Sequence, residues 1–442
     1  MAMRSLREPL LQKANLDRCI APPPRRPSEE KQLEDFSNDS GSSIVSTVIN
    51  LLKNMVGAGL LNVCIAFRYA SVIGGLIAMV FSAFVCTAGF LMIGYCCSKT
   101  RAKTFRELFR LSIGARYEKV VDVMLFFHCL FSCVGYVTLI GDFSQKSCAG
   151  LFPHSVFATS RSASVYVITV FCLFPLSLLR NLDKLKYTSA AGLGVTAFAC
   201  AYVFYDCIAN SSENGSMDVL REHSWYLRFD IFKAIALFNG SFSAHYNAPT
   251  YYAELRRKSF RRYAQATLYA FAIATVLFTT FGLAGFARYG DDVLGNVLKN
   301  YSAEDPMVQV SWMCMMISTI FVFPHAFQRM RSSWTALVNK PANLRAKSSI
   351  PVTTIALLAC SVYFGVAFED IAVIKMIKGA TLGVSIMFIM PGLIYLRLSA
   401  KDSGKDAQKG EPVAFLRGCC NLMIVVGIIQ GFMALASYYK LI

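Results

Sequence analysis

The feature that most constrains this chain is a series of apolar stretches, each of about the length needed to cross a membrane. A helix needs roughly 20 mainly apolar residues to span the hydrocarbon core of a bilayer. Eleven such stretches occur in the 442 residues, of which one is short and one is polar for a span. We therefore expect an all-α membrane protein with eleven transmembrane helices. The stretches are residues 44–67, 72–95, 119–142, 164–179, 188–208, 231–253, 266–287, 306–327, 349–367, 371–396 and 415–438.

The composition agrees with a chain that lies mostly in lipid. Hydrophobic residues make up 55% of the chain and charged residues only 16%, whereas about 25% charged residues is usual in soluble domains. No segment between the stretches is long enough to fold independently. Residues 1–43 are polar and rich in proline and serine, which predicts a disordered tail. Residues 44–442 then form one membrane domain.

The distribution of positive charge predicts the orientation of the chain. The net charge is +17, from 44 lysine and arginine residues against 27 aspartate and glutamate residues. Of those 44 cations, 32 lie in the tail and in alternate connections, and only 8 lie in the other connections. Because positive residues are enriched on the cytoplasmic side, we expect a cytoplasmic N-terminus. Charges spread over short loops, rather than gathered in one stripe, also disfavour a nucleic-acid partner.

Two kinds of residue are expected at the outer face. The glycosylation sequons at Asn210, Asn214 and Asn300 all fall in connections predicted to be outside. Cys148 and Cys207 fall there as well, where oxidation is permitted, so a disulfide between them is a hypothesis. The fifteen cysteines have no metal-binding spacing, and we expect no metal site.

The first span contains glycines beside polar residues. Gly57 and Gly59 interrupt an apolar run that also carries Lys53 and Asn54. Close helix packing would explain the glycines alone, but a lysine within a membrane is costly unless it is paired or solvated. A broken helix explains both features, because unwound backbone lines a cavity and its free N–H groups can receive an anion.

The sixth span has a matching anomaly. Residues 239–250 are too polar for a helix that faces lipid; Gly240, Ser241 and Ser243 permit an opening, and Pro249 removes an intrahelical hydrogen bond. Two interrupted spans at an interval of five indicate an inverted-repeat transporter. The repeats would be residues 44–208 and 231–396, with the helix at 415–438 appended.

Five ordered motifs between residues 43 and 400 carry a family resemblance. They are Asn50-Leu-Leu followed by Val56-Gly-Ala-Gly-Leu-Leu, Tyr136-Val-Thr-Leu-Ile-Gly-Asp142, residues 175–189, His245-Tyr-Asn247, and residues 289–296. They resemble the amino acid/auxin permease family, nearest its vacuolar and sodium-coupled neutral amino acid transporter branches. The resemblance implies an amino acid transporter domain with a leucine-transporter-type fold, a 5+5 inverted repeat plus one helix, and breaks in helices 1 and 6.

The resemblance also implies a substrate site at the two breaks. The substrate carboxylate would meet the first break and its ammonium group would meet carbonyls of the sixth break. Such a site suits a zwitterion, because each charged end meets an oriented backbone dipole. The implied binding residues are Asn54, Gly57, Ala58, Gly59, Phe238, Asn239, Gly240, Ser241 and Ser243.

The coupling ion is inferred from Lys53. The family resemblance implies asparagine at this position in sodium-coupled members. The ammonium group of a lysine there would repel a sodium ion. We therefore expect sodium-independent, proton-coupled transport; a lysine that reaches the membrane interface is the alternative reading. His245 has an imidazole that could sense the proton gradient or be structural. Ser318 and Thr319 could help form an ion site or bond back to their own helix.

Several alternatives stay open at this stage. A sensor that signals with little flux and a sodium-coupled symporter compete with the proton-coupled transporter. No catalytic motif indicates an enzyme; no cofactor is expected, and H⁺ rather than Na⁺ would be the transported ion.

The partners would be an amino acid and membrane lipid, without an obligate protein partner. The membrane would be vacuolar or lysosomal, or the plasma membrane. Asp142 could pair with a lysine or lie in the external vestibule, and Lys375 and Lys378 are read as interface anchors.

Overall fold

The computed structural model describes residues 41–178, 186–211, 215–226, 228–338, 350–401 and 413–441. Nearly all of the predicted tail, and Asn214 among the predicted glycosylation sites, lie outside these ranges. The described chain is helical, apart from short connections and one isolated bridge between Ser42 and Leu255.

The first half of the chain begins with a bent helical segment. The axes of Ile44–Val56 and Leu60–Ala70 differ by 46°. The elements are α3 (Ile44–Gly59), η1 (Leu60–Asn62), α4 (Val63–Ala70), α5 (Val72–Thr100), α6 (Phe105–Ser112), η2 (Ala115–Tyr117), α7 (Glu118–Leu151), α8 (Val156–Thr159), α9 (Arg161–Ile168), η3 (Thr169–Leu173), α10 (Phe174–Leu178), α11 (Lys186–Ala209) and α12 (Ser216–Glu222).

The second half also begins with an interrupted segment, in which residues 242–244 are not helical. The elements are α13 (Ile231–Ser241), η5 (His245–Asn247), α14 (Ala248–Glu254), α15 (Phe260–Tyr289), η6 (Gly290–Asp292), η7 (Val297–Asn300), α16 (Pro306–Val338), α17 (Ile350–Ala367), α18 (Ile371–Lys378), η10 (Gly379–Gly383), η11 (Ser385–Ile389), α19 (Met390–Lys401) and α21 (Val413–Tyr438).

The helices make this a multi-pass membrane protein. Seven helices in the described ranges are long and apolar enough to cross a membrane, and the bent pair makes as many as eight. Gly194–Ala209 and Pro351–Ala367 are shorter apolar helices. All eleven apolar stretches coincide with helical segments, with α13 and α14 sharing the sixth. The number of eleven spans stays a prediction.

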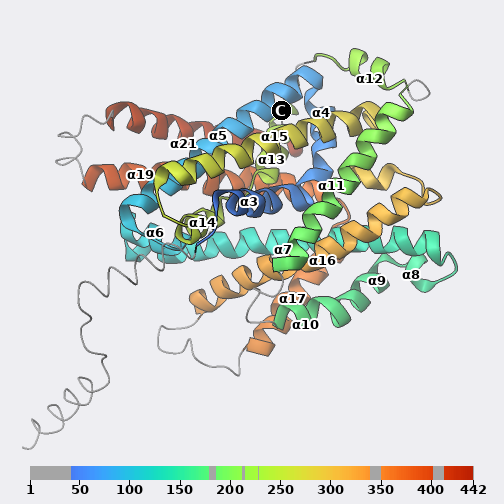
Figure 1. Cartoon of the computed structure of the whole chain (residues 1–442), viewed down its shortest axis with the longest axis horizontal. Helices are drawn as coiled ribbons and strands as arrows, with labels where there is room; N and C mark the ends of the chain where they lie inside the picture. The colour runs from blue at the N-terminus through green and yellow to red at the C-terminus, as the bar shows by residue number, and fades with distance from the viewer. Residues whose placement is uncertain are drawn as a thin grey trace, which may run out of the picture.

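Many of the long helices, such as α5, α7, α15 and α16, run roughly along the long axis of the molecule, whereas α4, α11 and α17 are steeply inclined to it (Figure 1). α3 lies between a group that contains α5, α13 and α15 and a group that contains α7, α16 and α17 (Figure 1). α6, which follows a span predicted to end inside, and α14, which ends another such span, lie toward one end. α8 and α12, from connections predicted to be outside, lie at the other end (Figure 1). The connections predicted to lie on one side of the membrane and those predicted to lie on the other are therefore at opposite ends of the molecule.

The first and sixth segments meet in the middle of the molecule. Ser241, the last residue of α13, donates its hydroxyl to the Gly59 carbonyl at 2.9 Å and to the Leu237 carbonyl at 3.0 Å. A Cβ on Gly59 would lie 3.2 Å from the Ser241 Cα atom, so glycine permits this close approach. Pro249 stands in the first turn of α14, where its missing N–H costs no helical hydrogen bond.

Glycines also allow backbone-to-backbone packing behind α13. A Cβ on Gly379 would lie 2.0 Å from the Ala236 carbonyl oxygen, and one on Gly431 would lie 2.4 Å from that of Ala380. Small residues at such positions let helices in membranes approach closely. The result is a tightly packed unit of α13, η10 and α21 that supports the end of α13.

A pair of substitutions in α21 tests this packing. Gly431→Ala should lower the stability by about 1–3 kcal/mol, because backbone atoms cannot move aside for the new methyl group. Gly418→Ala is the matched control, since nothing lies within 4 Å of its Cβ position. Thermal unfolding in detergent should show a lower midpoint only for the first variant. Equal midpoints would contradict the packing.

Candidate functional site

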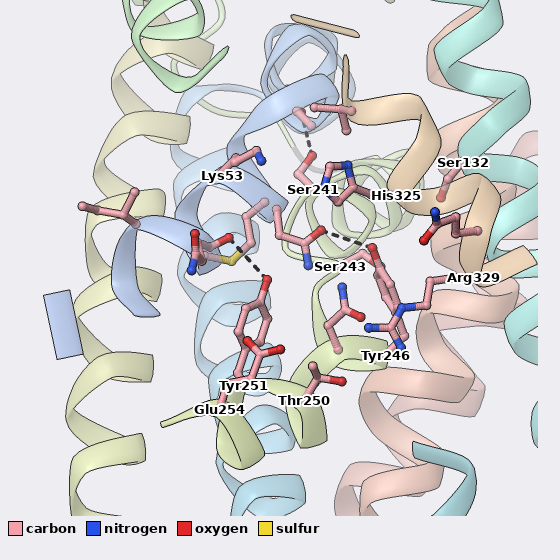
Figure 2. A pocket seen from close by; sticks show the side chains of 18 of the residues that line it. Lys53, Ser132, Ser241, Ser243, Tyr246, Thr250, Tyr251, Glu254, His325 and Arg329 are labelled. Carbon is pink, nitrogen blue, oxygen red and sulfur yellow. Dashed lines mark hydrogen bonds between the residues drawn. The ribbon is translucent and has the colours of Figure 1, made fainter. Parts of the chain in front are cut away.

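A central cavity of about 1250 Å³ adjoins the junction of the two segments. It is lined by α3, α7, the region from α13 to α14, α16 and α18. From Gly59 and Ser241 it extends along α14 to Glu254 (Figure 2). Its lining residues include Ser42, Glu254 and Lys258 at one end, but none from α8, α12 or the described loop that follows α15. The cavity therefore reaches toward one end of the molecule only.

The predicted substrate residues divide into three sets: five that line the cavity, two that pack behind it, and two whose surroundings the structure does not describe. Asn54, Gly59, Gly240, Ser241 and Ser243 line the cavity. Phe238 and Asn239, although adjacent in sequence, are buried and not among the described lining residues.

Each of those two residues instead packs behind the site. Asn239 donates from Nδ2 to Gln430 Oε1 at 3.1 Å, and the Phe238 ring lies edge-on to that of Phe67. Their side chains therefore fix α13 in place. Gly57 and Ala58 fall in the last turn of α3, and the surroundings of their side chains lie outside what the structure describes.

Two hydrogen bonds organise the polar wall of the cavity. Tyr246 donates its hydroxyl to Asn54 Oδ1 at 3.2 Å, which joins η5 to α3. Ser243 Oγ lies 3.3 Å from His128 Nε2, which joins the residues after α13 to α7 (Figure 2 shows Ser243 and Tyr246). The His128 and Tyr246 rings are also in contact, with centroids 5.1 Å apart. The wall therefore depends on α3, α7 and the interrupted segment together.

The predicted coupling residues do not form one site. Lys53 lines the cavity together with His325 of α16, and both side chains are visible in Figure 2. His245 lies behind the cavity, where its Nε2 is 2.7 Å from the Cys86 carbonyl and its ring packs on Phe90. This geometry gives His245 a structural role.

The two hydroxyl residues of α16 also bond away from the cavity. Thr319 donates to the Met315 carbonyl of its own helix at 2.7 Å, and Ser318 donates to the Gly192 carbonyl of α11 at 3.4 Å. Neither residue is among the described lining residues. Thr319 was expected either to help form an ion site or to bond to its own helix. In the structure its hydroxyl bonds to its own helix.

Lys375 and Lys378 are cavity-lining residues that the sequence reading missed. Both line the cavity, and Lys378 donates from Nζ to Ser132 Oγ of α7 at 2.7 Å. Lys378 is only 7% exposed. The expectation that they anchor a helix at the membrane interface is wrong, because α18 ends within the molecule and continues into η10. Their spacing of three residues, which puts both on one helix face, was the available signal.

The cavity has an excess of positive charge. Besides His325, five lysine or arginine side chains line it, and a single carboxylate does, that of Glu254. Glu254, Lys258 and Arg329 are exposed near the open end, whereas Lys378 lies buried deep in it. The deep part of the described cavity therefore contains ammonium groups without a carboxylate.

An ionic network around Asp142 joins helices away from the open end of the cavity. Asp142 at 2% side-chain exposure lies 3.3 Å from Arg161 and 3.5 Å from Lys299. Arg161 also donates to the carbonyls of Thr138, Gly365 and Val366. The predicted pairing of Asp142 with a lysine is confirmed; Arg161 was missed, because a contact over 19 residues leaves no local pattern. The network joins α7, α9, α17 and η7.

Loss of Arg161 tests this network. Arg161→Ala should lower stability by about 3–5 kcal/mol, because removal of one partner leaves a buried charge undercompensated. Arg221→Ala is the control, since that arginine forms an exposed pair with Asp218, and such pairs are worth about 0–1 kcal/mol. Thermal unfolding in detergent measures both. A similar small loss in the two variants would refute a stabilising role for the network.

The remaining predicted sites also lie away from the open end of the cavity. Cys148 and Cys207 are both free thiols, so the predicted disulfide is not present in the structure. Asn210 donates from Nδ2 to Asp206 Oδ1 at 2.6 Å, and Asn300 donates to the Asp292 carbonyl at 2.8 Å. Glycosylation at these asparagines stays a prediction. Among the described residues no group of three or more metal-binding side chains is present.

Comparison with known proteins gives consistent results. The sequence model of the family described as "Transmembrane amino acid transporter protein" matches residues 40–437. "Vacuolar amino acid transporter 2" of Saccharomyces cerevisiae is 22% identical over 414 residues, covering 88% of this chain and 83% of that protein. "Putative sodium-coupled neutral amino acid transporter 11" of Danio rerio is 22% identical over 369 residues, covering 83% and 81%. These relatives are named as transporters, not enzymes.

A solved structure has a similar fold. The structure titled "Inward facing conformation of Mhp1" matches with a TM-score of 0.58 at 12% identity, over 91% of this chain and 92% of that one. At this identity the similarity concerns the fold alone. It supports the leucine-transporter-type architecture that the motifs implied.

Proposed function

The chain belongs to the transmembrane amino acid transporter protein family, and on that premise we propose that it is a secondary active transporter that moves an amino acid by alternating access. The observation that carries the proposal is the cavity, which begins at the junction of α3 and α13 and reaches only one end of the molecule. The Asp142 network would close the other end. A site accessible from one side at a time is what alternating access requires.

We infer eleven spans in two inverted repeats. The bent pair of α3 and α4 would be broken helix 1, and α13 with α14 would be broken helix 6. Repeat 1 covers residues 44–208, repeat 2 covers 231–396, and α21 is the eleventh helix. The N-terminus and the open end of the cavity then face the cytoplasm, in agreement with the charge distribution. The membrane is vacuolar or lysosomal, or the plasma membrane.

The junction suits a zwitterionic substrate. α13 ends at Ser241, so the negative end of its helix dipole points toward the cavity and would receive the ammonium group. The substrate carboxylate would lie where α3 ends and η1 begins, beside backbone N–H groups at the start of the following helical segment, the positive end of its dipole. Gly59, Asn54 and Ser243 line the cavity there. The substrate is then held mainly by backbone groups, which recognise what all amino acids share.

We further propose that transport is sodium-independent and coupled to protons through Lys53. Lys53 lies on α3 and lines the cavity on the side where α16 contributes His325. A fixed ammonium group there repels a sodium ion at short range. It is also a group that can release and take up a proton, because lysine changes its charge readily when buried.

Flux into proteoliposomes tests the proposal. Labelled amino acids should accumulate when a proton gradient is imposed, and uptake should be unchanged when choline replaces sodium at fixed pH. Protein-free liposomes are the control. Uptake that requires sodium would instead establish the sodium-coupled alternative. Binding without flux under both gradients would replace the transporter by a sensor.

Substitutions of Lys53 separate coupling from transport. Lys53→Arg keeps a charge that does not titrate, and Lys53→Asn removes the charge. Both should lose proton-driven accumulation, while exchange of internal for external substrate persists. Lys119→Met, which removes an exposed lysine at the start of α7, should behave like the unchanged protein. Full accumulation by either Lys53 variant would remove Lys53 from the coupling mechanism.

A further inference from the structure

One face of α18 presents lysines to the cavity. Ile371, Ile374, Lys375 and Lys378 line it with spacings of three, four and seven residues, which corresponds to one side of an α-helix. α18 also adjoins the proposed ammonium site, because a Cβ on Gly240 would lie 3.1 Å from the Lys375 carbonyl oxygen. The lysine face and the end of α13 therefore belong to the same part of the cavity.

These lysines lack anionic partners within the described chain. No ion pair of the described residues includes Lys53, Lys375 or Lys378, and Lys378 has only the neutral hydroxyl of Ser132 at 2.7 Å. A buried ammonium group without a countercharge is costly in a membrane protein. Glu254, the carboxylate among the lining residues, is exposed at the open end of the cavity.

A neutral amino acid does not balance this charge. The charges of its ammonium and carboxylate groups sum to zero. Under the proposed function both groups are already bound at the junction of α13 and α3. The lysines on α18 would remain uncompensated. A second carboxylate on the substrate would supply the missing charge and accept charge-assisted hydrogen bonds from the lysines.

We propose that the transported substrate is an acidic amino acid whose side-chain carboxylate is bound by Lys375 and Lys378. This inference rests on the proposed function, because it assigns the substrate class of that same site. The α-ammonium and α-carboxylate bind at the junction, and the side chain extends toward α18. Ser132 holds the Lys378 ammonium group toward the cavity.

Glutamate and glutamine give the sharpest test, because they have nearly the same shape and differ in side-chain charge. Glutamate uptake into proteoliposomes under a proton gradient should exceed glutamine uptake at least about tenfold, as expected for the loss of a charged hydrogen bond. A preference for glutamine, or equal uptake, would overturn the inference. Absence of uptake of every amino acid tested would instead count against the transporter itself.

Lysine variants test whether the lysines of α18 cause the preference for glutamate over glutamine. Lys375→Met and Lys378→Met should each lower the ratio of glutamate to glutamine uptake about tenfold or more, whereas Lys119→Met should leave it unchanged. The ratio is measured in one preparation, so a smaller amount of folded protein does not alter it. An unchanged ratio in both α18 variants would overturn the assignment to Lys375 and Lys378.

A small inorganic anion is the competing occupant. Replacement of chloride by gluconate should leave glutamate uptake unchanged, because the substrate itself brings the second negative charge. If glutamine is the preferred substrate and its uptake requires chloride, the lysines bind the inorganic anion and the inference is wrong.

Discussion

The contact between the ends of α3 and α13 is the constraint on which the rest of the structure depends. Ser241 bonds to the Gly59 carbonyl, and Gly59 has no side chain to prevent the approach. Because two helical segments end at one point in the middle of the molecule, backbone groups that would otherwise need hydrogen-bond partners adjoin a cavity. The packing of α13 on η10 and α21 supports that arrangement from behind.

Charge is then distributed unequally about this junction. On the side away from the open end, Asp142 is surrounded by Arg161 and Lys299, and the buried ions are compensated. On the open side, the deep lysines face space rather than carboxylates. A transporter that alternates between two conformations, each closed at one end, needs ion pairs that stabilise one conformation but can break when the other forms. The excess of positive charge in the cavity leaves a place for the negative charge that the proposed substrate provides.

Sequence reasoning located the junction but not the complete site. Glycine and serine residues within apolar spans predicted breaks in two helices, because such residues oppose a continuous helix facing lipid. The structure has a bend of 46° in the first segment and non-helical residues 242–244 in the second. The family resemblance added Phe238 and Asn239 to the site through their backbone carbonyls, a role that stays a prediction; their side chains pack against Phe67 and Gln430. Sequence reasoning read Lys375 and Lys378 as interface anchors, since position along a span does not reveal which face of a helix borders a cavity.

The sequence by itself established that this chain lies mostly in lipid, where its helices lie, and the family to which it belongs. These follow from local composition and from residue order. Only the tertiary structure decided which polar side chains share the cavity, that Arg161 compensates Asp142, and that α18 turns its lysines inward. Such pairings join residues far apart in the chain, and they depend on the rotation and packing of each helix, which hydropathy leaves open.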